Sequence, residues 1–563
     1  MYANYTVPIP ELKGKVYIGN RKGHTYVDYE YDRVYKPEKK YNIPKRTTIG
    51  KVCDTDPQIM YPNSNYYKFF PDAQVPEEVP DTRSSCISVG AYIVVDKIIK
   101  DLNISKCLSD TFIEKETGIL LDLAFYSIVC ENNAAQYYSD FAYMHPALSE
   151  GMHIYSDSWI SEFLHDMTID QRIGFLNAWN TGRNRRERIY VSYDSTNKNC
   201  QAGDIQIVEF GHPKDDKGLP VFNYSLAYDC NNREPLFYEG YPGSIVDVSQ
   251  LQYTLGKMKS MGYENVGFIL DRGYFSKDNI RFMDEAGYNF VIMVKGMSSL
   301  VNEIIVENRG LFEEKGSCNI KKYRAYGTTV IKKLFVSDEK DRYFHLYFSS
   351  SKYSAEREAL ETKLERYDLM INKLRGKSDV KLSEEMLKYY DPMYHNDGTF
   401  LGAVEKKEVA EKELQLCGYY VIITSEKMSA KEALILYKGR DTSEKLFRGD
   451  KSYLGNKSIR VYSEESAESK IFIEFIALII RNKIYTSLKD TMEESGTRSN
   501  YMTVPATIKE LEKIQAIKLI DGVYKLDHAV TATQKSILKA FGIDEKYVKD
   551  KIQEIGVLLS AAG

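Results

Sequence analysis

The chain has 563 residues, which at about 150 residues per domain is enough for three or four units with cores of their own. Hydrophobic residues make up 43% of it and charged residues 28%, an ordinary composition that excludes a disordered or a fibrous chain. The net charge of −4, from 76 basic and 80 acidic residues, lacks the basic excess that is usual in nucleic-acid-binding domains.

Residues 1–85 are predicted to form a strand-rich, basic region, which is a candidate for DNA contact. Short strands are expected over 14–35, then a basic loop over 36–50 and a Pro-rich linker over 62–80. The first 60 residues hold eleven basic and seven acidic side chains together with eight tyrosines, which suits phosphate contact and base stacking. A Tyr-rich hairpin on a solvated surface would give the same pattern, so both interpretations stay open.

Residues 86–185 are predicted to form a helical domain. The apolar spacing of 119–130 and of 159–180 is that of amphipathic helices. The run RNRRER at 183–188 is either a charged linker or a contact to the DNA backbone.

Residues 186–300 show the alternation of strands and helices that is typical of an α/β sheet with mixed strand directions. A strand that ends at Asp194 comes first, followed by a hairpin with a Cys-Asn-Asn-Arg turn. The expected elements are strands at 188–196, 221–229, 234–242, 266–270 and 290–294, and helices at 246–261 and 276–286.

Residues 301–415 interrupt this alternation and are predicted to form an insertion domain, with a charged helix whose apolar positions run from Leu360 to Leu374. The α/β pattern resumes over 416–485 with a strand at 419–425 and helices at 429–447 and 471–485. The last part, 486–563, is expected to form two or three small helices.

Neither export nor a membrane span is expected. The longest apolar run, 471–480, contains Glu474 and is half as long as the ~20 residues that cross a bilayer. Residues 1–5 do not begin a secretory signal, so we expect a cytoplasmic protein. The eight cysteines include no close pair, so we expect reduced thiols rather than a zinc site or a disulfide framework.

Three carboxylates are placed as metal ligands would be. Asp194 and Asp271 come at the ends of predicted sheet strands, where open α/β sheets present their working groups. Glu444 lies on the helix that follows the strand at 419–425. Carboxylate oxygens are the ligands that Mg²⁺ prefers, and pairs of hard cations share them.

The helix of Glu444 carries further polar groups. Tyr437, Arg440 and Glu444 share one helical face, and Lys451 returns to it seven residues later, although Gly449 is expected to end the helix first. A phenol, a guanidinium and an ammonium can bind the oxygens of a phosphodiester, and the neighbouring carboxylate can bind a metal ion beside it. The alternative is a surface helix with an i,i+4 ion pair between Arg440 and Glu444.

The spacing Tyr-x2-Arg-x3-Glu-x6-Lys over 437–451, with YDST (193–196) and LDRG (270–273) upstream, resembles the DDE transposases of bacterial insertion sequences. The resemblance is to the branch named for this Tyr-Arg-Glu-Lys (YREK) signature, and it covers about 188–300 and 416–482. It implies an α/β protein with an RNase H-like catalytic core that is interrupted by an insertion domain, between a mixed N-terminal region and a helical C-terminal tail.

The same resemblance implies roles for individual residues. Asp194, Asp271 and Glu444 would be catalytic and bind two Mg²⁺ or Mn²⁺ ions, which activate the attacking water or 3′-hydroxyl and stabilise the leaving oxygen. Tyr437, Arg440 and Lys451 would bind phosphates at the transposon end, in a branch where cleavage commonly passes through a DNA hairpin with a flipped base. The segment GHPKDDKGLPVF (211–222) departs from the Arg-containing pattern of many relatives.

The expected function is cut-and-paste DNA transposition: binding of double-stranded inverted-repeat ends, metal-dependent cleavage, and strand transfer to target DNA by a homodimer on DNA. Two alternatives stay open. One is a non-catalytic or host-adopted DNA-binding relative, and the other is a nuclease of the same fold that never joins strands.

Overall fold

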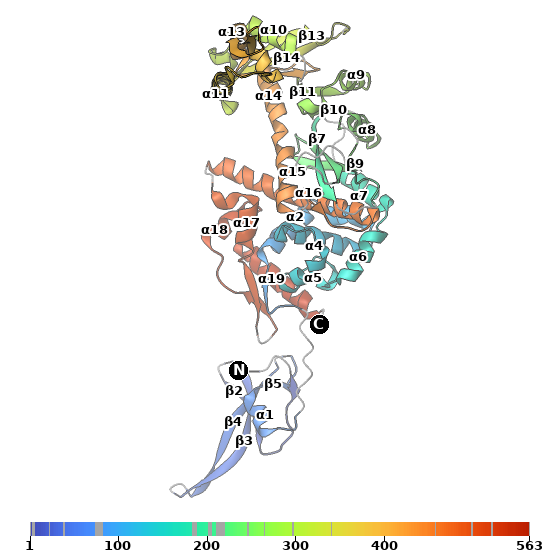
Figure 1. Cartoon of the computed structure of the whole chain (residues 1–563). Helices are drawn as coiled ribbons and strands as arrows, with labels where there is room; N and C mark the ends of the chain where they lie inside the picture. Colours follow the sequence, from blue (N-terminus) through green and yellow to red (C-terminus); the bar gives the residue numbers. More distant parts are fainter. Residues whose placement is uncertain are drawn as a thin grey trace. The chain divides into compact units, whose positions relative to one another are not determined.

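A computed structural model of the chain describes residues 2, 6–21, 23–37, 40–53, 55–73, 83–182, 188–200, 205–209, 220–244, 247–263, 265–294, 298–338, 340–455, 458–496, 499–519 and 522–561 (Figure 1). The chain divides into two compact units. The first comprises Met1–Met167 and Ile480–Gly563, and the second is Thr168–Ile479.

The first unit begins with a sheet of its own, in the order β1-β5-β4-β3-β2 with antiparallel pairing throughout its described strands. Val27, Ile49 and Met60 are fully buried in its core. Its elements are β1 (Val7–Pro8), β2 (Val16–Arg21), β3 (His24–Lys36), β4 (Tyr41–Val52), β5 (Ile59–Pro62) and α1 (Ser64–Phe69).

The expected basic loop over 36–50 is wrong, because most of it forms β4. Pro44 and the run of charges suggested a loop, but Pro44 lies where β4 pairs with β3 alone, and such an edge tolerates a residue without an N–H.

The rest of the first unit is mainly helical, as the patterns in 86–185 predicted. Three short strands are added to it, and two of them, β19 and β20, come from the tail where only helices were expected. Strands of three or four residues are too short to show a sequence period of two. The elements are β6 (Cys86–Ser88), β19 (Gln515–Lys518), β20 (Tyr524–Leu526), α2 (Gly90–Asp101), α3 (Ile104–Ser109), α4 (Glu114–Cys130), α5 (Tyr138–Met144), α6 (Asp157–Asp166), α17 (Val504–Leu511), α18 (Ala532–Lys539) and α19 (Glu545–Ala561).

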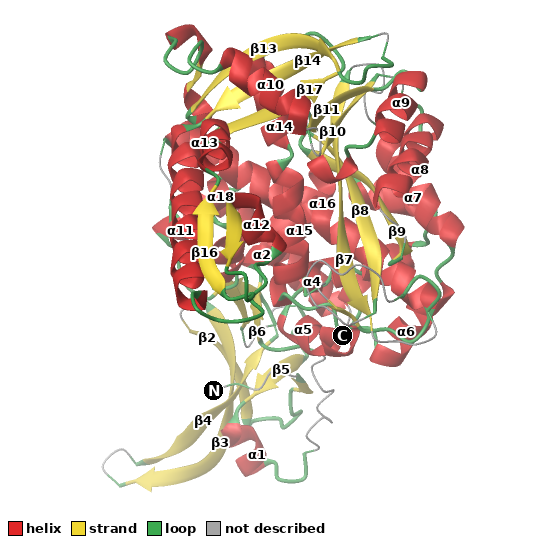
Figure 2. Cartoon of the chain, turned by 45° about the horizontal axis from the view of Figure 1, so that its top comes forward, coloured by secondary structure: helices red, strands yellow, loops and turns green. Residues whose placement is uncertain are grey.

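The second unit is built on a mixed sheet, to which its described residues contribute ten strands in the order β12-β13-β14-β17-β11-β10-β7-β8-β9, with β18 paired to β7 (Figure 2). The strands β7, β8 and β9 form an antiparallel meander, and β10 and β11 run parallel to β7. The strands are β7 (Ile189–Cys200), β8 (Val221–Asp229), β9 (Glu234–Pro242), β10 (Val266–Leu270), β11 (Asn289–Met293), β12 (Asn319–Ile320), β13 (Ala325–Lys333), β14 (Asp341–Phe348), β17 (Tyr419–Thr424) and β18 (Ser458–Ile459).

The predicted strands of 186–300 and 416–425 are confirmed, but the end of the first one is wrong. That strand continues to Cys200, so Asp194 lies in its interior. The residues after Asp194 are Ser, Thr and Asn, and the burial that keeps them in a strand comes from the neighbouring β8, which is buried along its whole length.

The segment expected to form an insertion domain contributes in two ways. Its first part supplies β12, β13 and β14 to the central sheet, where β14 pairs with β17. Its second part has a separate core in which Leu360, Tyr367 and Ile371 of α11 are buried. Besides β12 to β14, the segment holds α10 (Ser298–Asn308), α11 (Ser350–Leu374), α12 (Glu384–Tyr389), β15 (Tyr390–Tyr394), β16 (Phe400–Glu405) and α13 (Lys407–Leu416).

The remaining helices of the second unit include the elements that carry the predicted signature. They are α7 (Ile169–Thr181), α8 (Asp247–Ser260), α9 (Lys277–Glu285), α14 (Ala430–Gly439), α15 (Asp441–Tyr453) and α16 (Glu464–Ser495), which runs past the boundary of the unit. In the part of the chain that the structure describes, no helix has both the length and the apolar character of a membrane span.

A buried ion pair joins α16 to the sheet. Lys198 of β7 contacts Glu474 of α16, and the two side chains are 0% and 2% exposed. The Lys198 ammonium also lies 4.6 Å from the centroid of the Tyr224 ring. Glu474, which interrupts the apolar run of 471–480, is therefore explained by its buried partner Lys198.

Replacing Glu474 by Gln leaves the buried Lys198 ammonium without its counter-charge. We expect Glu474→Gln to lower the free energy of unfolding by about 3–5 kcal/mol, as removal of one partner of a buried pair does. Urea denaturation measures this change. Glu361→Gln, in an exposed i,i+4 pair with Arg357, is the matched control and should not move the transition. Equal effects of the two variants would contradict the buried-pair interpretation.

Candidate active site

Asp194 and Asp271 are brought side by side by the register of two parallel strands. Leu270, the last residue of β10, pairs with Tyr193 of β7. The residues that follow them, Asp271 and Asp194, therefore occupy matching positions next to each other. Side chains at matching positions of a parallel pair lie on the same face. Although these aspartates are 77 positions apart in the sequence, they are neighbours across one sheet.

Local backbone groups orient both aspartates. The Ser195 N–H donates to Oδ1 of Asp194 at 2.8 Å. Asp271 is the N-cap of a short 3-10 helix, η3 (Arg272–Tyr274), and its Oδ1 accepts from the Arg272 N–H at 2.6 Å. Each carboxylate is thus held in place by the backbone N–H of the residue that follows it.

Packing of α14 on the sheet positions the signature residues. Ala430, Leu434 and Tyr437 follow one another at i, i+4 and i+7 and are buried against sheet residues that include Ile269 of β10. The Tyr347 hydroxyl donates to the Ala430 carbonyl at 2.7 Å and fixes the start of the helix. The helix packs across several strands of the sheet: its start lies at Tyr347 of β14, and Arg440 at its end reaches Asp271, which follows β10.

Arg440, the C-cap residue of α14, joins the carboxylates of two elements. Its Nη1 lies 3.2 Å from Asp271 Oδ1, and its Nη2 donates to Glu444 on the next helix, α15. The Arg440 guanidinium lies 5.4 Å from the centroid of the Tyr437 ring. The Arg440 side chain is 11% exposed, whereas Asp271 and Glu444 are 38% and 48% exposed.

The charge on Arg440 is stabilised by its surroundings. Burial favours the neutral form, but Tyr437 and the three carboxylates of Asp271, Glu444 and Asp194 together raise the pKa of Arg440 above its ordinary value. Arg440 is therefore within electrostatic reach of all three predicted acids. Burial raises the pKa of the Tyr437 phenol to about 12, so Tyr437 stays neutral and cannot serve as a base near neutral pH.

Glu444 and Lys451 lie on α15, which is longer than expected. The helix does not end before Gly449 but continues to Tyr453, and the Glu444 N–H donates to the Arg440 carbonyl at 3.3 Å, which links α15 to the end of α14. Seven residues advance about 10 Å along a helix axis and return to nearly the same face. Lys451 is thus on the face of Glu444, about two turns away from it.

Within the described residues, no three carboxylate, His or Cys side chains approach closely enough to hold a metal ion. The expected cage of three acids around two ions is not formed in this arrangement, because Arg440 lies between Asp271 and Glu444. Asp271 and Glu444 instead share the Arg440 guanidinium, and all three side chains are carboxylates, the ligand type that Mg²⁺ prefers.

Some sequence features lie elsewhere or were given no role. Residues 183–187 of RNRRER and 211–219 of GHPKDDKGLPVF lie outside the described residues. Tyr437 is 5% exposed and packs in the core, although the resemblance implied contact with phosphate. Arg272, to which the sequence pattern gave no role, carries a charge that partly opposes the rise in the pKa of the Tyr437 phenol that burial causes. Its place in LDRG, directly after Asp271, was the available signal.

A family model described as a transposase DDE domain matches residues 193–480, slightly more than half of the 563 residues. The match begins one residue before Asp194 and includes Asp271 and Glu444. No curated protein matches the chain. A similar solved structure is described as the cryo-EM structure of the piggyBac transposase synaptic complex with hairpin DNA, at 9% identity, 82% coverage of each chain and a TM-score of 0.32.

The burial of Tyr437 predicts that its ring contributes more to the stability of the fold than its hydroxyl does. We expect Tyr437→Ala to lower the free energy of unfolding by about 3 kcal/mol or more, since truncation of a buried aromatic leaves a cavity. Tyr437→Phe keeps the ring and should change it by less than about 1.5 kcal/mol. Urea denaturation of both variants measures this. A Tyr437→Ala protein as stable as the wild type would show that the ring contributes nothing to the core.

Proposed function

Since this chain belongs to the family of proteins with a transposase DDE domain, we propose that it cuts double-stranded DNA at the inverted-repeat ends of a bacterial insertion sequence and joins the 3′ ends to target DNA. The observation that carries this proposal is the placement of the three acids within the matched residues: Asp194 and Asp271 follow paired positions of two neighbouring strands, and Arg440 contacts both Asp271 and Glu444. The family match supports transposition in general, and the Tyr-Arg-Glu-Lys spacing supports the YREK branch.

We assign the catalytic core to the RNase H-like fold, over 186–300 and 416–485. Its support is the strand order β9-β8-β7-β10-β11, in which an antiparallel meander is followed by two strands parallel to its first strand. Residues 301–415 would be the insertion, between a region at 1–85, a helical domain at 86–185 and the tail at 486–563. The separate core around α11 supports an inserted unit.

The residues at the site fit a divalent metal. Two carboxylates, Asp271 and Glu444, contact the Arg440 guanidinium, and the charge of Asp194 helps them to raise the pKa of Arg440, so the site already stabilises positive charge. Asp194, Asp271 and Glu444 would hold two Mg²⁺ or Mn²⁺ ions, which supply activation of the attacking hydroxyl and stabilisation of the leaving oxygen. In this proposal Arg440 leaves the carboxylates and donates to a DNA phosphate, for which its planar fork is suited.

The other signature residues support Arg440 and the DNA. Tyr437 lies beneath the Arg440 guanidinium and would orient it through a cation–π contact rather than reach the phosphate itself. Lys451 would contact a second phosphate two helical turns from Glu444. A transposon has two ends, so we propose that a homodimer holds them on DNA.

The central experiment supplies purified protein with a labelled duplex that carries the inverted repeat flanking its own coding sequence, together with Mg²⁺ and a target plasmid. We expect cleavage and joining, and a loss of at least about 10²-fold in both steps for Asp194→Asn, Asp271→Asn and Glu444→Gln, because each removes a ligand worth several kcal/mol. DNA binding should persist in the three variants.

Asp278→Asn is the matched control, because Asp278 is an exposed carboxylate on α9, a few residues after Asp271. Normal cleavage by Asp194→Asn and Glu444→Gln would overturn the assignment. Cleavage without joining would identify a nuclease of the same fold, and binding without cleavage a non-catalytic relative. Imperfect inverted repeats around the coding sequence, with short direct duplications outside them, are also expected.

The contact of Arg440 with two carboxylates predicts how metal binding responds to its removal. We expect Arg440→Gln to bind Mn²⁺ at least several-fold more tightly than the wild type in the absence of DNA, because Asp271 and Glu444 no longer share a fixed cation. Isothermal titration calorimetry measures the dissociation constants. Arg357→Gln, which also breaks an ion pair with a Glu, is the control. Weaker Mn²⁺ binding by Arg440→Gln than by the wild type would contradict this account.

A further inference from the structure

Strands β3 and β4 continue past the rest of their own sheet as a two-stranded ribbon (Figures 1 and 2). The pairing of β2 with β3 ends at Tyr29, and β5 pairs with β4 only over 50–52. Beyond the pair of Glu30 and Arg46, the described residues of the two strands pair with each other alone. We call residues 31–37 and 40–46 the ribbon.

The ribbon has no core of its own. Its described side chains are exposed except for the half-buried Ile43. Tyr35 and Tyr41 are 57% and 55% exposed. A two-stranded hairpin without a packed face is at best marginally stable in water, so this ribbon needs support at its root.

That support is an ion cluster around Glu30, which is 4% exposed. Its Oε1 accepts from Arg33 at 2.5 Å, and its Oε2 accepts from both Nε and Nη2 of Arg46 at 3.1 Å and 3.0 Å. The Arg46 guanidinium also lies 3.5 Å from the centroid of the Tyr17 ring on β2. These contacts join side chains of β2, β3 and β4 at the root of the ribbon.

The ribbon beyond its root is basic. Apart from Arg33 and Arg46, which pair with Glu30 at the root, its described residues hold three basic side chains, Lys36, Lys40 and Lys45, and a single acidic one, Asp32, which contacts Lys45 at 3.2 Å. Lys36 and Lys40, near the tip, form no ion pair with any residue that the structure describes. An exposed rod of positive charge is complementary to a polyanion.

The edges of the ribbon disfavour pairing with a second copy of the chain. Pro44 lacks an N–H, and a register shift between Glu30 and Asp32 places an extra residue, Tyr31, as a bulge. Lysines, proline and bulges are the devices by which exposed strand edges avoid intermolecular pairing. An external ligand would therefore bind the exposed side chains of the ribbon and their charges rather than the backbone edges of its strands.

We propose that the ribbon binds double-stranded DNA by lying in the major groove, with Lys36, Lys40 and Lys45 on the flanking phosphates. The major groove is about 12 Å wide and admits a two-stranded β-ribbon. The six residues 31–36 reach about 20 Å at 3.3 Å per residue. Tyr35 and Asn42 form a cross-strand pair on one face and meet the base edges, where Asn reads adenine. This inference rests on the proposed function only in that DNA is the substrate.

The test compares full-length wild type with Lys36→Gln/Lys40→Gln/Lys45→Gln for binding to a 30-base-pair duplex of arbitrary sequence, by fluorescence anisotropy at several salt concentrations. At about 0.9 per phosphate contact, the triple variant should lower the slope of log affinity against log salt by about 2.7. It should weaken binding at least tenfold at physiological salt.

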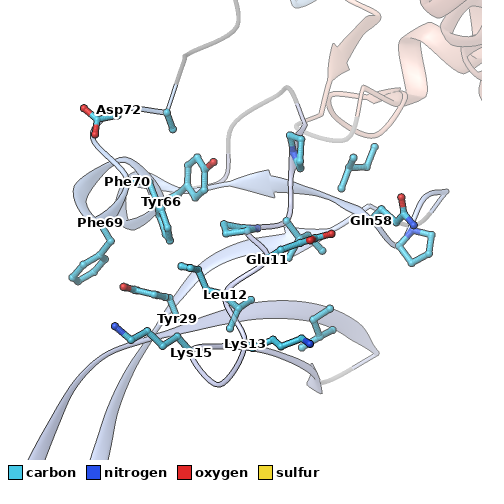
Figure 3. A pocket seen from close by; sticks show the side chains of 18 of the residues that line it. Glu11, Leu12, Lys13, Lys15, Tyr29, Gln58, Tyr66, Phe69, Phe70 and Asp72 are labelled. Atoms are coloured by element: carbon cyan, nitrogen blue, oxygen red, sulfur yellow. The ribbon is translucent and has the colours of Figure 1, made fainter.

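The matched control is Lys13→Gln/Lys15→Gln/Lys68→Gln, which removes the same charge from exposed positions of the same sheet region. Lys13 and Lys15 line a separate groove of about 1650 Å³ together with Tyr29, Phe69 and other residues of that region (Figure 3). We expect this control to change the slope by much less. Equal slopes for the two triple variants would overturn the ribbon assignment.

Hydrogen exchange of the wild type gives a measurement that needs no variant. Addition of the duplex should slow exchange in peptides that cover 31–46 and leave those that cover 8–16 unchanged; the reverse pattern would overturn the proposal. A change of oligomeric state in the ribbon variant without a change in DNA affinity would identify a protein interface instead. In an Asp194→Asn background, the triple lysine variant should weaken DNA binding and lower the salt slope as much as it does in the wild type. A failure of the proposed cleavage activity and a failure of the proposed DNA contact by the ribbon are therefore distinguishable results.

Discussion

The Arg440 guanidinium is the interaction on which the site depends. It is contributed by the end of one helix, contacts the carboxylate that follows a buried strand, and contacts a second carboxylate one turn further along the chain. Without it, the negative charges of Asp194, Asp271 and Glu444 would repel one another across a partly buried sheet edge. Because Tyr437 lies beneath the guanidinium and is itself packed in the core, the position of this charge is fixed by the apolar packing of α14 on the sheet.

Transposition by this chain would require that interaction to be exchangeable. A guanidinium carries one charge, whereas two divalent ions carry four, so metal and phosphate together can replace Arg440 at the carboxylates without leaving uncompensated charge. The buried Lys198–Glu474 pair has the opposite character: both partners are enclosed, no solvent reaches them, and their contact holds α16 on the sheet. In the second unit, the contacts of Arg440 with Asp271 and Glu444 can therefore be replaced by other cations, whereas the Lys198–Glu474 pair is structural.

Much of the central sheet could be predicted from sequence, and the reasons are local. The buried strands 266–270 and 221–229 are bounded by turn residues, and Asp271 stands directly after the first of them. The extent of β7 past Asp194 could not be predicted, because Ser195 to Asn199 are polar and owe their burial to β8. The place of β12 to β14 in the central sheet could not be predicted, because they join it through the pairing of β14 with β17, which links segments about 75 residues apart. The bridging role of Arg440 was visible only as an i,i+4 pair, since its second partner lies on another element.

The ribbon's attachment also bears on how such a protein diversifies. Its root is held by Glu30, Arg33, Arg46 and Tyr17, and none of the described positions among 34–37 and 40–45 belongs to the buried core of their sheet. Substitutions at those outer positions can therefore accumulate without loss of folding, and the same anchored hairpin can carry many different surface chemistries. A lineage could in this way change the nucleotide sequence it prefers while the carboxylates and their strands stay constant.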